Sequence, residues 1–144
     1  MKKESMEANI RETKLNDITH LGIRLAVGLI FLVHGIGKAA NPGFGGFLSN
    51  LGLPAEMAPL IALAEIIPGI LLIIGVLSRI ASSLLSIIMI GAILHVKKAQ
   101  TLTGGQGAYE FELILLAANL AIITMGPGRI SIAHIAKKIP RFLH

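Results

Sequence analysis

The chain has 144 residues, of which 53% are hydrophobic and only 15% are charged. Soluble globular domains carry about 25% charged residues, so this composition is typical of a single membrane domain. The chain has no cysteine, which excludes disulfides, thiolate nucleophiles and cysteine-ligated metal centres. Its net charge is +5. Because the basic residues lie beside apolar segments, we expect them to contact the lipid bilayer. We expect no nucleic-acid partner.

Residues 1–17 are mixed in charge and lack an apolar run, so we interpret them as a cytoplasmic N-terminal tail. A helix needs about 20 apolar residues to cross the hydrocarbon core of a bilayer. Four segments approach that length, at residues 18–39, 55–77, 79–96 and 108–125. The second and third are joined so tightly that they must form an antiparallel hairpin. We therefore expect an all-α integral membrane protein whose domain, residues 18–128, is a four-helix bundle.

Two segments outside these spans have helical apolar spacing. Residues 41–54 carry phenylalanines and leucines in this pattern, which predicts a short helix in the outer membrane interface. The alternative is a loop whose phenylalanines pack on the bundle. Residues 129–144 combine isoleucines with lysines and arginines, which predicts a basic amphipathic C-terminal segment lying in the interface. A frayed tail is the alternative there.

Basic residues are distributed unevenly around the predicted spans. Nine lie on the side of the N-terminus, namely Lys2, Lys3, Arg11, Lys14, Arg79, Arg129, Lys137, Lys138 and Arg141. Three lie on the opposite side, namely Lys38, Lys97 and Lys98. Because lysine and arginine favour the cytoplasmic side, we predict a multi-pass protein of the cell membrane with both termini in the cytoplasm.

The predicted spans also contain ionisable groups, although a charge at the bilayer midplane costs roughly 2.5 kcal/mol or more. Lys38 follows His34 by four residues and shares a helix face with it, and Arg24 lies on nearly the same stripe. Depth places most of the other groups in the outer half of the bundle. We therefore predict one polar cluster that opens outward and binds a ligand, formed by Arg24, His34, Lys38, Glu65, His95, Glu110 and Glu112.

Within this cluster, Glu65 is expected to be paired with Arg24 or protonated, because a lone carboxylate inside lipid is costly. Arg24 lies deeper than the other groups, but its side chain is long. Such a pair would serve either as a structural ion pair that fixes helix packing or as part of a ligand-binding or proton-relay site. Lys38 has the alternative of extending to the interface without any functional role.

Three further residues are expected to have structural roles. Pro68 is predicted to kink the second span, Asn119 to hold helices together, and Arg79 to mark the hairpin at the cytoplasmic side. Two histidines at similar depth, His34 and His95, would permit bis-histidine ligation. They are weak grounds for a metal, so we expect neither a metal nor a haem site.

Several motifs, taken in order, resemble the DoxX family of small four-helix membrane proteins. They are Arg24 with HGIGK at 34–38, LGLP at 51–54, AEIIPGILLIIGVLSR at 64–79, the GG…E stretch at 104–110 and GPGRIS at 126–131. The resemblance covers residues 24–131. The sequence departs from the family pattern at Pro68, where a glycine is usual, and at Ala133 and His134, where an aspartate often follows.

The resemblance implies a protein associated with redox chemistry, similar to the membrane subunit of thiosulfate:quinone oxidoreductase or to relatives linked to oxidative stress and to quinone and catechol handling. We expect a subunit of a membrane redox system whose polar cluster binds a quinone head group or another small ligand. The alternatives are a non-catalytic accessory subunit of a larger enzyme and a small transporter or proton path. Because such a bundle cannot transfer electrons without a bound cofactor, we expect it to act with other membrane subunits or as a homo-oligomer, not as an enzyme alone.

Overall fold

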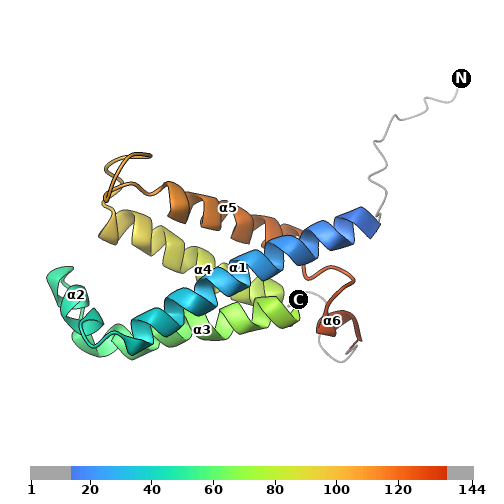
Figure 1. Cartoon of the computed structure of the whole chain (residues 1–144), viewed down its shortest axis with the longest axis horizontal. Helices are drawn as coiled ribbons and strands as arrows, with labels where there is room; N and C mark the ends of the chain where they lie inside the picture. Colours follow the sequence, from blue (N-terminus) through green and yellow to red (C-terminus); the bar gives the residue numbers. More distant parts are fainter. Residues whose placement is uncertain (1–13, 136–144) are drawn as a thin grey trace, which may run out of the picture.

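The computed structural model describes residues 14–135, which form helices joined by short links and one longer loop (Figure 1). The four longest helices are α1 (Lys14–Ala40), α3 (Ala58–Ile74), α4 (Ser78–Gly91) and α5 (Glu110–Met125). The short elements are α2 (Phe44–Asn50), a 3₁₀ turn η1 (Ala55–Met57), a π-helical turn η2 (Ala92–Val96) and α6 (Ile132–Ile135).

The long helices run antiparallel to their neighbours, so the molecule has two distinct ends (Figure 1). The start of α1, the α3–α4 turn and α6 lie at one end, called here the terminal end. The helix α2 and the loop that precedes α5 lie at the other, called here the loop end. Helix α1 packs mainly on α3, and α4 mainly on α5. The bundle therefore consists of two helix pairs with a core between them.

Within residues 14–135, three segments are long and apolar enough to cross a membrane: Lys14–Ala40, Ala55–Ile74 and Ser78–Val96. They match the first three predicted spans, and the all-α membrane fold is confirmed. The predicted count of four membrane-spanning helices is not confirmed. Helix α5 has 16 residues, or about 24 Å at 1.5 Å per residue, and falls short of a hydrocarbon core of about 30 Å. Helix α5 begins at Glu110, two residues after the predicted start of the span. The reason is that Thr101 pairs with Ala108, and the Thr101 carbonyl accepts a hydrogen bond from the Tyr109 amide at 3.2 Å.

The tight hairpin between α3 and α4 is confirmed, with a link of only three residues. Gly75 ends α3 in the left-handed region at φ 73°. The amides of Gly75 and Val76 both donate to the Leu71 carbonyl, at 2.9 and 3.0 Å. This closure satisfies the end of the helix and turns the chain directly into α4.

The predicted boundaries at the chain ends are only partly covered by the described residues. Helix α1 begins at Lys14, inside the segment predicted as a tail. Of the predicted C-terminal amphipathic segment, residues 129–135 are described and include the single turn of α6. Residues 1–13 and 136–144 lie outside the described range, so most of the predicted features of both tails lie outside it as well.

Glycines set the distance between α1 and α3. A Cβ on Gly28 would lie 2.8 Å from the Gly69 carbonyl oxygen, and one on Gly69 would lie 2.9 Å from the Gly28 carbonyl oxygen. About two turns further along α1, a Cβ on Gly35 would lie 2.9 Å from the Ala62 carbonyl oxygen. The two backbones are thus in direct contact at two levels, as small residues allow in membrane helix pairs.

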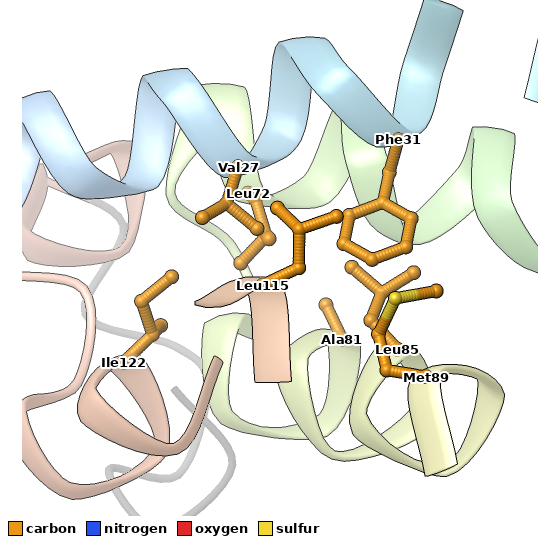
Figure 2. Packing of buried hydrophobic residues seen from close by; sticks show 8 residues of the cluster. All are labelled: Val27, Phe31, Leu72, Ala81, Leu85, Met89, Leu115 and Ile122. Atoms are coloured by element: carbon orange, nitrogen blue, oxygen red, sulfur yellow. The ribbon is translucent and has the colours of Figure 1, made fainter. Parts of the chain in front are cut away.

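The hydrophobic core fills the space between the two helix pairs (Figure 2). All four long helices contribute to it, and Leu72 and Leu85 are its most deeply buried side chains. The members of this cluster are Val27, Phe31, Leu72, Ala81, Leu85, Met89, Leu115 and Ile122. The outer helix faces expose leucines and isoleucines instead, which is the arrangement expected when lipid surrounds the bundle.

The predicted pairing of Arg24 with Glu65 is wrong. The glycine contacts place Gly75 beside Arg24, where a Cβ on Gly75 would lie 2.9 Å from the guanidinium carbon. Glu65 lies next to Ile66, which contacts Gly35. Arg24 and Gly35 are eleven residues apart in α1, or about 16 Å along the axis, so the two charges lie at different levels of the bundle.

Arg24 instead holds the chain that follows α5. Its side chain is 2% exposed. Its guanidinium donates to the carbonyl oxygen of Pro127 and, at 2.7 Å, to that of Ile130. The planar fork of arginine suits two acceptors at once, and the two bonds anchor residues 126–131 to the first helix.

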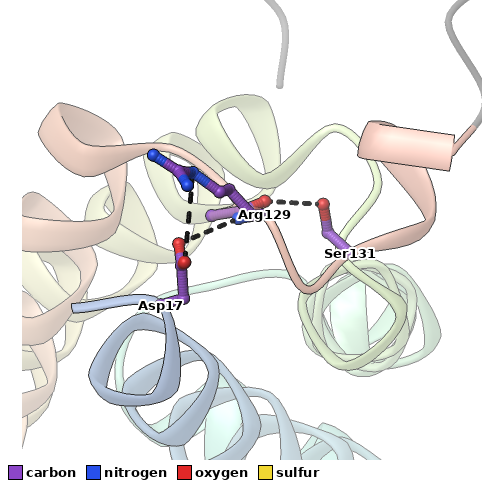
Figure 3. Close-up of polar contacts among 4 residues, drawn as sticks. Asp17, Arg129 and Ser131 are labelled. Atoms are coloured by element: carbon purple, nitrogen blue, oxygen red, sulfur yellow. Dashed lines mark hydrogen bonds and ion pairs between the residues drawn. The ribbon is translucent and has the colours of Figure 1, made fainter. Parts of the chain in front are cut away.

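Further polar contacts fasten the same segment (Figure 3). The Arg129 amide donates to Asp17 of α1 at 3.4 Å, and the Arg129 side chain lies 3.9 Å from the same carboxylate. The Ser131 hydroxyl donates to the Gly128 carbonyl at 2.9 Å, and the Ala133 amide donates to the Gly75 carbonyl at 3.3 Å. Residues 126–133 thus join α1 to the α3–α4 turn.

The α1–α3 contact generates a first prediction. Gly28→Ala should destabilise the protein by about 1–3 kcal/mol, because the added methyl forces the two backbones apart. Gly22→Ala on the same helix is the matched control, since nothing lies within 4 Å of its Cβ position. Thermal unfolding in one detergent compares the two variants with the wild type. Equal shifts for both would show that close backbone contact does not hold the pair.

Arg24 generates a second prediction. Arg24→Lys keeps the positive charge but lacks the planar guanidinium group, so one of the two hydrogen bonds to the Pro127 and Ile130 carbonyl oxygens is lost. A hydrogen bond to a charged group contributes about 1.5–3 kcal/mol, so amide exchange in residues 126–135 should become roughly tenfold to a hundredfold faster. Hydrogen exchange followed by mass spectrometry measures this. Asp17→Asn, which alters a partly exposed pair, is the control and should change exchange much less. Unchanged exchange in Arg24→Lys would contradict the anchoring role.

Candidate functional site

A pocket of about 450 Å³ opens near the loop end, between α1, α2, α3, the end of α4, η2 and α5. Its polar lining consists of His34, Lys38, Glu65, His95 and Glu112. The rest of the wall is hydrophobic apart from one glycine, with Phe31, Phe44, Phe47 and Phe111 as its largest side chains. The pocket is thus an apolar chamber with a few ionisable groups from four separate elements.

Five of the seven residues predicted for the polar cluster line this pocket, and two do not. Arg24 lies at the terminal end, as described above. Glu110 is exposed at the first residue of α5, whereas Glu112 is half-buried and faces the pocket. Two residues are about 200° of helix rotation, so these neighbouring glutamates point to opposite sides of α5.

Glu65 is the most deeply buried ionisable group of the pocket. Its side chain is 1% exposed, and its Oε1 atom forms an ion pair with the Lys38 ammonium, whose side chain is 30% exposed. Lys38 also lies 5.6 Å from the centre of the Phe44 ring. Lys38 therefore points inward to a carboxylate, where the alternative interpretation had it extending to the interface.

The second carboxylate of the pocket has a lysine as well. Glu112 Oε1 lies 3.9 Å from the Lys97 ammonium, which also donates to the Gln106 carbonyl oxygen at 3.2 Å. Lys97 thereby ties the loop before α5 to the pocket wall. The sequence signal for it was only its position just after the third span, so its role was not predicted.

Each carboxylate keeps one unused oxygen. Glu65 Oε2 and Glu112 Oε2 are both buried and have no hydrogen-bond partner among the described residues. A buried acceptor without a partner costs about 1–3 kcal/mol, and more when it is charged. These two atoms are therefore the groups of the pocket with the strongest need for a donor.

The two histidines stand at the pocket wall with little burial. The ring of His34 lies 5.9 Å from that of Phe111, and His95 belongs to the π-helical turn η2. Widened turns of this kind are frequent at functional sites. Within residues 14–135, no three histidine, aspartate or glutamate side chains lie close enough together to hold a metal ion.

The predicted short helix before the second span is confirmed as α2. Its Phe44 and Leu48 are buried, and both line the pocket together with Phe47. The rings of Phe44 and Phe47 are stacked, with centroids 6.1 Å apart. The apolar spacing of residues 41–54 predicted this helix, but not that it would form one wall of a pocket.

The three residues predicted to be structural have different surroundings. Pro68 is buried inside α3, which is continuous through it. Asn119 is fully buried, but its amide donates to the Leu115 carbonyl of its own helix at 2.9 Å rather than to another helix. Arg79 lies in the first turn of α4, at the terminal end, and its Nε atom is buried.

Comparison with known proteins identifies the family of this chain. A family model described as DoxX matches residues 19–98. The Bacillus subtilis protein named "Putative oxidoreductase CatD" is 37% identical over 108 residues, which cover 74% of this chain and 79% of that protein. The Mycobacterium tuberculosis protein named "Uncharacterized membrane protein Rv3486" is 37% identical over 125 residues, which cover 76% of each chain. No solved structure gives a significant match. The family match covers more than half of the chain and agrees with its apolar helices, so this protein is a membrane protein of the DoxX family.

Proposed function

We propose that this protein is a subunit of a membrane redox system and that its pocket binds the head group of a quinone or a similar ring. The observation that carries the proposal is the pocket itself. Its volume of about 450 Å³ lies in the range of small-molecule sites, about 300–1,000 Å³, and such sites combine apolar walls with a few placed polar groups.

The residues present suit a ring of this class. Aromatic and aliphatic side chains from α1, α2 and α5 supply flat apolar surface for the ring. Hydrogen bonds to its oxygen atoms would come from His34 and His95, which line the wall. A quinone would supply two-electron chemistry that this chain lacks, while the chain would bind and orient it.

A partner is part of the proposal. A helical bundle without cysteine has no group of its own that passes single electrons to a quinone. The name of the Bacillus subtilis relative describes an oxidoreductase, and we extend that class of chemistry to the complex in which this chain acts. Other membrane subunits or further copies of the chain would complete that complex.

We also propose that the terminal end faces the cytoplasm of the cell, so that the pocket opens in the outer half of the membrane. Lys14, Arg79 and Arg129 lie at the terminal end, and Lys38, Lys97 and Lys98 lie at the loop end. With the basic residues of both tails counted, the excess is on the terminal side, which the positive-inside rule assigns to the cytoplasm.

Binding is the direct test of the pocket. Purified protein in nanodiscs should bind duroquinone saturably. His34→Ala should weaken binding about twofold to tenfold, because a neutral hydrogen bond contributes about 0.5–1.5 kcal/mol. His134→Ala is the control, since this exposed histidine of α6 does not line the pocket. Isothermal calorimetry or equilibrium dialysis measures the affinities. If wild-type protein shows no saturable binding, the pocket assignment fails and the accessory-subunit alternative replaces it.

Orientation has its own test, for which the absence of cysteine is convenient. Lys14→Cys and Thr103→Cys place single thiols on exposed residues at opposite ends of the molecule. In right-side-out vesicles, a membrane-impermeant maleimide should label position 103 and reach position 14 only after the vesicles are opened. The reverse pattern would invert the proposed orientation.

A further inference from the structure

We propose that the pocket selects its ligand in the reduced, hydroxyl-bearing form, and that Glu65 is the residue that makes this selection. The inference rests on the proposed function, because it names the state of the ring that the same pocket takes. It follows from one feature of the site: the atoms that lack partners are acceptors.

Glu65 presents one committed and one uncommitted oxygen. Oε1 is held by Lys38, while Oε2 is buried and unpartnered among the described residues. Because the ion pair neutralises the carboxylate and fixes its position, Oε2 is a fixed, buried acceptor on a residue that lines an apolar pocket. The same arrangement recurs on α5, where Lys97 lies beside Glu112 Oε1 and Oε2 is unpartnered.

An oxidised ring and a reduced ring meet these acceptors differently. A quinone carries carbonyl oxygens, which only accept hydrogen bonds, so beside Glu65 Oε2 two acceptors would face each other and the buried oxygen would stay unsatisfied. A hydroquinone carries hydroxyl groups, and each can donate to a carboxylate. A site built to hydrogen-bond a hydroxyl rejects the analogue that lacks it, because its own buried polar atom is then left without a partner.

The donors in the pocket do not reverse this preference. Lys38 and Lys97 each give one N–H group to a carboxylate, and because both side chains are partly exposed, water can satisfy their other N–H groups. The two histidines are largely exposed, so water can satisfy their ring nitrogens when no ligand is bound. Among the polar groups of the pocket, only the buried carboxylate oxygens have no access to water. The contact that best distinguishes a hydroquinone from a quinone is therefore donation from the ligand hydroxyl to Glu65.

Three ligands with the same methyl substituents test the proposal on the wild-type protein in nanodiscs: duroquinone, durohydroquinone and the dimethyl ether of durohydroquinone. The ether keeps the ring and its oxygens but has no donor. We expect durohydroquinone, kept reduced under argon, to bind at least tenfold more tightly than either of the others. For a two-electron couple, a tenfold preference raises the midpoint potential of the bound couple by about 30 mV.

Substitutions of Glu65 test whether this residue causes the preference for the hydroquinone. Glu65→Gln should reduce the preference for the hydroquinone to threefold or less, and the double variant Lys38→Met with Glu65→Gln should do the same without leaving the lysine unpaired. Glu110→Gln is the matched control, because it makes the same change at an exposed glutamate outside the pocket. Size-exclusion profiles and thermal unfolding verify that each variant is folded.

The outcomes separate this inference from the proposed function. Equal affinity for the three ligands, or a preference that survives in both Glu65 variants, overturns the selection by Glu65 and leaves a quinone-type pocket standing. Absence of binding by all three ligands overturns both. A decyl-tailed hydroquinone then identifies the source of the ring: clearly tighter binding than durohydroquinone assigns it to a membrane carrier, and equal binding assigns it to a free ring diol, and either result supports the selection of hydroxyl groups.

Discussion

Direct backbone contact between α1 and α3 is the constraint on which the rest of the structure depends. At Gly28, Gly35 and Gly69 no side chain separates the two helices, so their relative position along the axis has little freedom. That alignment decides which polar groups meet. It brings Lys38 within reach of Glu65 near the loop end, and it sets Arg24 beside Gly75 near the terminal end. Two cations on one helix, the buried Arg24 and the partly buried Lys38, thereby receive separate partners.

The pocket follows from this alignment together with the short elements at the loop end. The apolar face of α2 covers one side, and η2 widens the end of α4 so that His95 and its neighbours reach the wall. The charges that line the chamber are compensated in pairs within the fold. A membrane protein can hold such groups only where they are paired or solvated, and this arrangement provides the pairing while leaving one carboxylate oxygen of each glutamate available.

Sequence patterns predicted much of this architecture, and they failed where two helices had to be aligned. Hydropathy identified all four long helices, the tight hairpin and the helix of residues 44–50, because each is a local property of the chain. Helical periodicity also grouped His34 with Lys38 correctly. The partner of Glu65 could not be found in this way, since the spacing within α1 says nothing of its offset along α3. The start of α5 at Glu110 and the role of Lys97 depend on contacts across the loop before α5. A periodic sequence pattern carries no information about such contacts.

The position of Arg24 has a consequence for how the protein is made. Its acceptors are 103 and 106 residues further along the chain. At synthesis rates of about 5–20 residues per second, roughly 5 to 20 s pass before those carbonyl groups leave the ribosome. During that interval the first helix carries a guanidinium whose final partners do not yet exist, a costly state inside lipid. Stable burial of this helix is therefore a late event of biogenesis, completed only when the last part of the chain folds back onto the first.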